Sequence, residues 1–364
     1  MRYAVIMAGG SGTRLWPLST AQRPKQLIPI VGGKSLIRIA NDRLEGLIPA
    51  EQRCIAASQS VCDRIAETLP EIPRANIIGE PAIRDTLPAM GLTAAVLHKT
   101  DPDAVIAVFT ADHIIEPIEL FQQRIDTAMN LAEANPDALI TFGIEPTHPA
   151  TAYGYVELGE ESAGFDHTHT TNAFKEKPDR DTAEQYINSG KYLWNSGMFV
   201  WRASALLRAI EKYEPQVSQG LQQIADAWHT DQQQATLENI YPALNKTSID
   251  FAVMEPAAAD PQTPVFTVRM PVKWLDVGSY SALAETVSPD TNQNRIDAPA
   301  AFVSESTGNL IISDDPNHLI AVSGIENLVV VKTENATLIC TKQHAEQLKQ
   351  LHAALRENGF EKYL

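Results

Sequence analysis

The first residues of the chain constrain its fold more than any other stretch. Residues 3–8 form a short apolar run, which is followed by three glycines within residues 9–12. This pattern is typical of a buried strand that ends in a loop. Glycine lacks a Cβ atom, so the backbone N–H groups of such a loop can point at the anionic oxygens of a closely bound ligand. The sequence therefore predicts a phosphate-binding loop, to which Arg14 and Lys25 add fixed positive charge.

The spacing of these glycines distinguishes the loop from two common phosphate-binding motifs. Leu15 stands where a Walker loop and a dinucleotide fingerprint each require their last glycine, and no lysine follows it. The pattern G-G-x-G-T-R-L-x-P-L, followed by R-P-K-Q, instead resembles the N-terminal signature of the nucleoside-diphosphate-sugar pyrophosphorylases. With Trp16 and Gln26 it is most similar to the mannose-1-phosphate guanylyltransferase branch. The alternative is a glycine-rich turn with incidental basic neighbours.

The composition limits the class of protein. With 364 residues, 44% of them hydrophobic, the chain can form one large domain with an appendage, or two domains. No apolar run is long enough to span a membrane, and too few residues precede the glycines to form a secretory signal. The three cysteines form no C-x-x-C pair, which indicates reduced thiols. We therefore expect a cytoplasmic protein with no membrane partner.

The charge of the chain bears on its partners. A formal net charge of -16 argues against non-specific binding of nucleic acid, so no nucleic-acid partner is expected. An acidic protein that binds a polyanion must reverse its own field locally. Arg14, Arg23, Lys25, backbone amides and a divalent cation could do so.

Short apolar segments alternate with amphipathic ones along most of the chain. Strands are expected near residues 53–57, 75–79, 104–111 and 139–144, with helices near residues 35–44, 61–69, 91–97 and 117–132. This alternation predicts an α/β fold with a mostly parallel sheet that is covered on both faces. The resemblance implies a Rossmann-like, GT-A-like nucleotidyltransferase domain.

The composition changes at Pro289, so we expect one domain over residues 1–288 and a second over residues 289–364. Apolar tetrads that start at Asn309, His318, Asn327 and Thr337 recur at intervals of about nine residues, which indicates a β-meander or a few coils of β-helix. The family resemblance implies a small β-rich domain of the left-handed β-helix type. An amphipathic helix near residues 343–358 follows, and we expect this domain to serve packing or assembly, with a homodimer formed through it.

The segment E-P-A-I-R-D-T-L-P-A, which starts at Glu80, resembles the E-P-x-x-R-N-T-A-P-A segment that lines the nucleotide pocket in the guanylyltransferases. Asp85 and Leu87 depart from that pattern, which puts the base preference in doubt. The alternative is a loop that caps the following helix with Asp85 or Thr86. The resemblance implies that the nucleotide is bound by Ala8, Gly9, Gly10, Ser11, Gly12, Thr13, Glu80, Arg84, Thr86 and Pro88.

Asp112 follows the most apolar strand of the chain, and ligands of open α/β sheets gather beyond the carboxyl ends of the strands. A hard cation such as Mg²⁺ takes one or two protein carboxylates there, although Asp112 could instead cap the helix after Pro117. The segment T-A-D-H resembles the metal-binding aspartate segment of the family, and the resemblance alone pairs Asp112 with the distant Asp276. His113 is expected to be an orienting or structural residue. The histidines of residues 166–171 are expected at a hairpin tip and not in a metal site.

The sugar side of the site rests on further resemblances, to the F-x-E-K-P, W-N-S-G-M-F and D-x-A-V-M-E segments of the family. Glu176 could accept from vicinal hydroxyl groups while Lys177 neutralises the sugar phosphate. Adjacent residues on a strand point to opposite faces, so one of the two could instead be solvated, and Asp250 could instead be a helix cap. The residues implied for the sugar phosphate are Tyr153, Gly154, Glu176, Lys177, Asn195 and Asp250.

Taken together, the resemblance implies an Mg²⁺-dependent enzyme that makes GDP-mannose and pyrophosphate from GTP and α-D-mannose 1-phosphate. Arg14 and Lys25 would be its catalytic residues. A sugar phosphate is already an anion at neutral pH, so its attack on the α-phosphorus needs no general base. Two alternatives remain open at this point: a sister enzyme with another base or hexose, and a catalytically silent regulatory subunit. The second would be expected to lack the loop or metal residues, which are all present.

Overall fold

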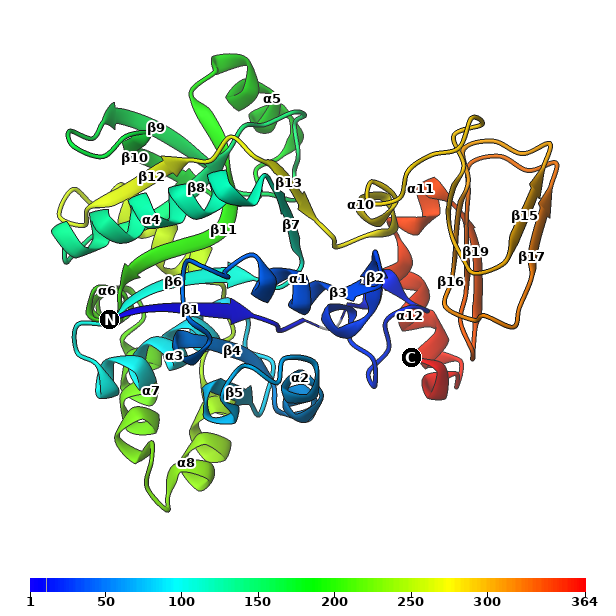
Figure 1. Cartoon of the computed structure of the whole chain (residues 1–364). Helices are drawn as coiled ribbons and strands as arrows, with labels where there is room; N and C mark the ends of the chain where they lie inside the picture. The colour runs from blue at the N-terminus through cyan, green and yellow to red at the C-terminus, as the bar shows by residue number, and fades with distance from the viewer. Residues whose placement is uncertain (11) are drawn as a thin grey trace. The chain divides into compact units, whose positions relative to one another are not determined.

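The computed structural model describes residues 1–10 and 12–364 (Figure 1). The chain forms two compact units that interleave in sequence. Unit 1 consists of Met1–Gly9, Ala40–Ala111 and Ile115–Trp274, and unit 2 consists of Gly10–Ile39, Asp112–Ile114 and Leu275–Leu364. The division into consecutive domains at residue 288 stays a prediction.

Unit 1 is built on a nine-stranded sheet with the order β5-β4-β1-β6-β11-β8-β12-β10-β9. Its strands are β1 (Arg2–Met7), β4 (Arg53–Ser58), β5 (Ile77–Glu80), β6 (Val105–Thr110), β8 (Leu139–Ile144), β9 (Tyr155–Glu161), β10 (Thr168–Lys175), β11 (Tyr192–Arg202) and β12 (Val265–Arg269). The expected α/β class is confirmed. Strands β5, β4, β1 and β6 are parallel, whereas β11 runs antiparallel to both β6 and β8, so the sheet as a whole is mixed.

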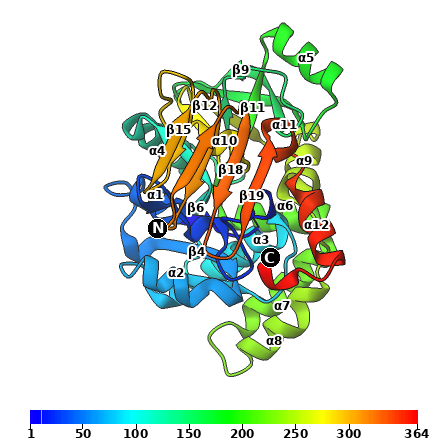
Figure 2. The ribbon, with the colours of Figure 1, turned by 90° about the vertical axis from the view of Figure 1, so that its right-hand side faces the viewer.

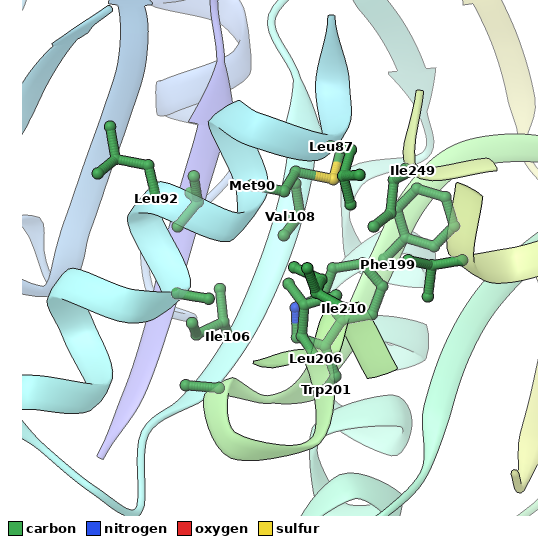
Figure 3. Close-up of a cluster of buried hydrophobic side chains, with 14 of the residues drawn as sticks. Leu87, Met90, Leu92, Ile106, Val108, Phe199, Trp201, Leu206, Ile210 and Ile249 are labelled. Atoms are coloured by element: carbon green, nitrogen blue, oxygen red, sulfur yellow. The ribbon is translucent and has the colours of Figure 1, made fainter. Parts of the chain in front are cut away.

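Helices cover both faces of this sheet. On one face, α3 (Thr86–Thr100), α6 (Ala203–Tyr213) and α7 (Pro215–Ala227) pack together over an apolar core, in which Met90 and Leu206 lie near Val108 and Phe199 (Figure 3). Successive side chains of a strand point to opposite faces, so Phe109 faces the other side. There it contacts Phe121 of α4 (Ile118–Ala134). The remaining helices of this unit are α2 (Cys62–Thr68), α5 (Arg180–Ser189), α8 (Gln233–Ile240) and α9 (Glu255–Ala259).

Helix α3 begins at Thr86, several residues before the helix start expected near Gly91. The carboxylate of Asp85 accepts a hydrogen bond from the Thr86 N–H at 2.9 Å and caps the helix. Asp85 itself has a φ of 67°, a backbone conformation that is rare for a residue other than glycine. The capping role considered for Asp85 is therefore present, and the segment after Pro81 is more helical than expected.

Unit 2 contains a short β-helix. Strands β14 (Arg295–Asp297), β16 (Leu310–Ser313) and β18 (Leu328–Lys332) pair in parallel, as do β15 (Ala301–Ser304) and β17 (Ile320–Ser323). Parallel pairing identifies stacked coils and excludes the antiparallel meander that the spacing also allowed. Strand β19 (Thr337–Thr341) lies antiparallel beside β18 (Figure 2). The expected terminal helix is divided into α11 (Lys342–Ala345) and α12 (Leu348–Glu357).

The N-terminal loop belongs to the core of unit 2. Leu15, Trp16 and Leu18 share one buried apolar cluster with Leu310 and Val331 of the β-helix. The other elements near the loop are β2 (Pro29–Val31), β3 (Lys34–Ser35), α1 (Leu36–Asp42) and α10 (Tyr280–Ala284). Strands β7 (His113–Glu116) and β13 (Lys273–Asp276) form a separate two-stranded sheet. Over the described part of the chain, no helix is both long and apolar enough to cross a membrane.

Candidate functional site

The loop that is expected to bind phosphate requires glycine at two of its described positions. Gly10 and Gly12 have φ angles of 99° and 61°, which side-chain-bearing residues rarely adopt. A Cβ atom on Gly12 would also lie 3.1 Å from the Cβ of Lys25, so the missing side chain lets the lysine approach the loop. Ser11 lies outside the described residues. Thr13 and Arg14 follow in a 3₁₀ helix, η1 (Thr13–Leu15).

In unit 2 the structure brings together two acidic residues that are far apart in sequence. Asp112, His113 and Asp276 each offer one ligand atom, and these atoms lie within 4.8 Å of one another. The Lys25 ammonium donates to the Asp112 carboxylate at 2.5 Å, and the Val277 N–H donates to the Asp112 carbonyl at 3.0 Å. Strand β7 separates Asp112 from α4, whose N-cap is Pro117. Asp112 is therefore not the cap of that helix.

The neighbours of the two aspartates give them different pKa values. Burial would raise the pKa of Asp112, but the charge of Lys25 lowers it to about 2. Burial and the negative charge of Asp112 raise the pKa of Asp276 to about 6, against the opposing charges of Lys25 and Arg14. A divalent cation would relieve the repulsion between these carboxylates, and hard cations such as Mg²⁺ prefer oxygen ligands. These residues therefore fit such a cation.

In unit 1 the structure brings together the acidic residues expected to bind the sugar. The Lys177 ammonium donates to Glu176 at 2.6 Å, and the side-chain amide of Asn195 donates to Asp250 at 2.8 Å. A Cβ atom on Gly154 would lie 2.5 Å from a Glu176 carboxylate oxygen and 3.2 Å from the Cβ of Asn195. Gly154 is therefore needed for this close approach.

Glu176 and Lys177 were expected on a strand, where neighbouring side chains point to opposite faces. Strand β10 in fact ends at Lys175, and Lys177 adopts a positive φ of 46°. This backbone turn lets the two neighbouring side chains pair with each other, while Glu176 is buried and Lys177 is exposed, as the alternative of one solvated residue allowed.

In this second cluster the raised pKa of Asp250 favours the protonated, neutral form of its carboxyl group. Burial and the charge of Glu176 raise the pKa of Asp250 to about 7, although the Asn195 amide and Lys177 oppose this shift. Burial would lower the pKa of Lys177, but pairing with Glu176 raises it. Asp250 begins the π-helix η7 (Asp250–Met254), whose N-cap is Ile249, so the alternative capping role is not found. A carboxyl group that titrates near neutrality can both donate to and accept from a hydroxyl group.

In unit 1 the segment from Glu80, which is expected to bind the nucleotide, forms hydrogen bonds to residues 241–249. Glu80 accepts from the Tyr241 hydroxyl at 2.6 Å, and Thr86 accepts from the Ile249 N–H at 2.9 Å. The guanidinium of Arg84 donates to the Pro242 carbonyl. Gly9, the last residue of unit 1 before the loop, is close to the Glu80 carboxylate, because a Cβ atom there would lie 3.8 Å from it.

Comparison with known proteins decides the family. A family model described as nucleotidyl transferase matches residues 3–293, and one described as MannoseP isomerase/GMP-like β-helix domain matches residues 302–355. The mannose-1-phosphate guanylyltransferase of Klebsiella pneumoniae is 35% identical to this chain over 367 residues, which cover 100% of this chain and 76% of that protein. The chain belongs to the mannose-1-phosphate guanylyltransferase family. A guanylyltransferase of this name from Escherichia coli shows the same identity and coverage.

Solved structures share the fold of this guanylyltransferase-family chain. A protein from Thermus thermophilus named mannose-1-phosphate geranyltransferase matches with a TM-score of 0.85 and 28% identity, over 98% of this chain and 99% of that one. A mannose-6-phosphate isomerase from Helicobacter pylori matches with a TM-score of 0.60 and 23% identity, over 75% of this chain and 100% of that one, and supports the fold alone. Nucleotidyltransferases of this family generally use a divalent metal.

Two features of the candidate site are not predicted from the sequence. His113 has its Nε2 atom 4.0 Å from Asp112 and belongs to the possible metal-binding group, and its position directly after Asp112 was the available signal. Trp274 has its ring centre 5.0 Å from that of Tyr153, which also lies 5.2 Å from Trp194. The pairing of these distant aromatic residues could not be inferred from their spacing.

Proposed function

We propose that this protein catalyses guanylyl transfer from GTP to α-D-mannose 1-phosphate. A phosphate oxygen of the sugar phosphate attacks the α-phosphorus of GTP, the bond from that phosphorus to the bridging oxygen breaks, and GDP-mannose and pyrophosphate form. The main support for this proposal is that two cations and two carboxylates lie close together in a chain whose relatives are named mannose-1-phosphate guanylyltransferase. These residues are Arg14, Lys25, Asp112 and Asp276. The attacking group is already an anion, so the protein needs to supply alignment and charge neutralisation but no general base.

The two clusters would divide the substrates between them. The loop amides from Gly9 to Thr13 and the Arg14 guanidinium would hold the pyrophosphate, and Lys25 would neutralise the α-phosphate and the incoming phosphate. Asp112 and Asp276 would hold Mg²⁺, which when bound supplies further neutralisation of phosphate charge.

The sugar cluster and the segment from Glu80 would give specificity. Glu176, Asn195 and Asp250 would bind the sugar hydroxyls, next to Tyr153 and Gly154, and Lys177 would face the sugar phosphate. The residues proposed for the nucleotide outside the loop are Ala8, Glu80, Arg84, Thr86 and Pro88. A homodimer through the C-terminal domain and the location of the protein in the cell stay predictions.

The test is pyrophosphate release with Mg²⁺ from four nucleoside triphosphates, each combined with mannose, glucose and N-acetylglucosamine 1-phosphates. We expect the highest rate with GTP and mannose 1-phosphate. A peak at another combination would retain nucleotidyl transfer and contradict the proposed substrates. Absence of release from every combination would contradict the proposal and favour a regulatory subunit.

A matched pair of variants ties any release to this site. Lys25→Ala removes the ammonium that pairs with Asp112 and should abolish most of the activity. Lys332→Ala removes a comparable lysine, which pairs with Asp315 at 3.1 Å in the same unit, and should leave activity near that of the wild type.

A further inference from the structure

A buried tyrosine, Tyr280, forms hydrogen bonds to the main chain directly after the proposed phosphate-binding loop. The hydroxyl of Tyr280 donates to the carbonyl of Leu15 at 2.9 Å and lies 3.2 Å from that of Trp16, so one O–H is shared between two adjacent main-chain acceptors. The Tyr280 side chain is fully buried, and burial raises its pKa well above the usual value. The neutral Tyr280 hydroxyl is therefore the donor in both contacts.

Tyr280 also belongs to the segment that carries Asp276. It begins helix α10, which is capped by the Ser279 hydroxyl, and it follows Asp276 by four positions. Gly278 lies between them, and a Cβ atom there would be 3.3 Å from an Asp276 carboxylate oxygen and 3.7 Å from the Arg14 guanidinium. The Tyr280 hydroxyl thus ties the main chain beside Arg14 to the segment that presents Asp276.

A second hydrogen bond holds the same turn from the C-terminal segment. The indole N–H of Trp16 donates to the carbonyl of Tyr363 at 2.7 Å. A pocket of about 220 Å³ lies nearby, lined by Thr13 and Ser19 on the loop and by His352 and Arg356 on α12. The turn is therefore held by the apolar cluster that buries Leu15 and Trp16 and, in addition, by the hydrogen bonds of Tyr280 and Trp16.

We propose that Tyr280 and Trp16 are positioning residues that fix the turn at Leu15 so that Arg14 meets the pyrophosphate. Neither side chain needs to touch the substrate, since each acts through the main chain next to Arg14. The inference rests on the proposed function and deepens it, because it assigns a role to the C-terminal segment that the sequence suggested for packing or assembly alone.

The test is the variant Tyr280→Phe, which removes the hydroxyl and keeps the ring. Small displacements of positioning groups cost about 10- to 100-fold, so the Kd for pyrophosphate with Mg²⁺, measured by calorimetry, should rise by about that factor. The KM for mannose 1-phosphate should change by less than about twofold, because the residues proposed for the sugar lie in unit 1. A merely structural role would reduce the fraction of active protein and leave both constants unchanged.

Two further variants keep the test decisive. Trp16→Phe removes the hydrogen bond to Tyr363 and should weaken pyrophosphate binding in the same selective way, even if Tyr280→Phe fails to fold. Tyr213→Phe is the control, because its hydroxyl bonds to Asp260 at 2.9 Å in unit 1, and it should leave both constants at wild-type values.

Unchanged pyrophosphate affinity in both loop variants would overturn the proposal, as would equal weakening of pyrophosphate and sugar phosphate. Pyrophosphate binding requires no choice of nucleotide or sugar. A wrong substrate assignment would therefore appear in the activity matrix alone, while a wrong positioning role would appear in the calorimetry of these variants.

Discussion

Each compact unit holds a pair of carboxylates of which one is paired with a lysine. In unit 2, Asp112 lies 2.5 Å from the Lys25 ammonium, and in unit 1, Glu176 lies 2.6 Å from that of Lys177. In each pair the lysine stabilises the negative charge of its partner. The two pairs differ in the groups that surround the second carboxylate.

In unit 2 the second carboxylate, Asp276, has cations and an imidazole as neighbours, namely Lys25, Arg14 and His113. In unit 1 the second carboxylate, Asp250, has Lys177 as its neighbouring cation and accepts from the Asn195 amide, and its pKa of about 7, against about 6 for Asp276, allows it to carry a proton near neutrality. The first arrangement suits phosphate groups bridged by a divalent cation. The second suits hydroxyl groups, which both donate and accept hydrogen bonds. We therefore expect the two pairs of carboxylates to bind different ligands, because their neighbours differ.

The comparison fails if Asp112 can be lost without a large effect on turnover. Asp112→Asn removes a proposed metal ligand and the partner of Lys25. Metal ions supply several kcal/mol of charge stabilisation in such reactions, so kcat should fall about a thousandfold or more. The measurement is pyrophosphate release at saturating substrates, together with the thermal midpoint to show that the variant is folded.

The matched control for this change is Asp315→Asn. Asp315 pairs with Lys332 at 3.1 Å in the same unit and has no proposed role in the reaction. Turnover close to that of the wild type in Asp112→Asn, or an equal loss in the control, would refute the metal-site assignment.

The raised pKa of Asp250 predicts how stability depends on pH. The folded protein keeps this proton up to about pH 7, whereas the unfolded chain releases it near pH 3.8, so the folded state binds more protons between these values. The free energy of unfolding should therefore fall as the pH rises through this window, by roughly 2–4 kcal/mol from this group. Asp250→Asn should lose that part of the slope in denaturant titrations at successive pH values.

A control with the opposite sign is Asp260→Asn. Hydrogen bonds from Lys212 and Thr263 lower the pKa of Asp260, so its contribution is present at neutral pH and is lost on acidification. If Asp250→Asn retains the full wild-type slope between pH 4 and 7, Asp250 does not carry the proton.

Glu176 tests whether the second pair binds the sugar. Glu176→Gln keeps the shape of the side chain and removes its negative charge. The hydrogen bonds from Lys177 and from the proposed sugar hydroxyls would then no longer be made to a carboxylate. Hydrogen bonds to charged groups contribute about 1.5–3 kcal/mol, so kcat/KM for the sugar phosphate should fall about 10- to 100-fold, while pyrophosphate affinity stays the same. Glu184→Gln, which removes the partner of Arg180 at 3.0 Å on α5, is the control. A loss of pyrophosphate affinity in Glu176→Gln would show that the two clusters do not act separately.

Much of the fold could be predicted from local sequence. Apolar runs such as that of β6 and the recurring strands after Asn309 need only short-range pattern, and both are found where expected. The interleaving of the two units could not be predicted in this way. It depends on the packing of Leu15 and Trp16 against Leu310 and Val331, which are almost the full length of the chain apart.

The residues of the candidate site stay a prediction, and the way in which they come together could not be inferred from the sequence. Asp112 and Asp276 could be paired only by resemblance, because no spacing rule relates residues so far apart. The pairing of Glu176 with Lys177 depends on a positive φ at a lysine, which residue type argues against. Leu87, which the sequence leaves open as a determinant of base preference, is fully buried in the core of unit 1.

The smallest expected effect concerns Asp85, the other departure from the family pattern. Asp85 is exposed, yet its negative charge contributes to raising the pKa of Lys177, so it adds to the negative charge around the proposed sugar-phosphate contact. Asp85→Asn keeps a side-chain oxygen for the cap of α3 and removes that charge. Exposed charge pairs contribute less than about 1 kcal/mol, so the KM for the sugar phosphate should fall by about two- to fivefold at low salt and converge with that of the wild type at high salt. Asp179→Asn, at the cap of α5, provides the same chemical change at a helix start with no proposed role in the site. A shift in the preferred base, with the KM for the sugar phosphate unchanged, would instead place Asp85 on the nucleotide side and leave the second pair of carboxylates independent of it.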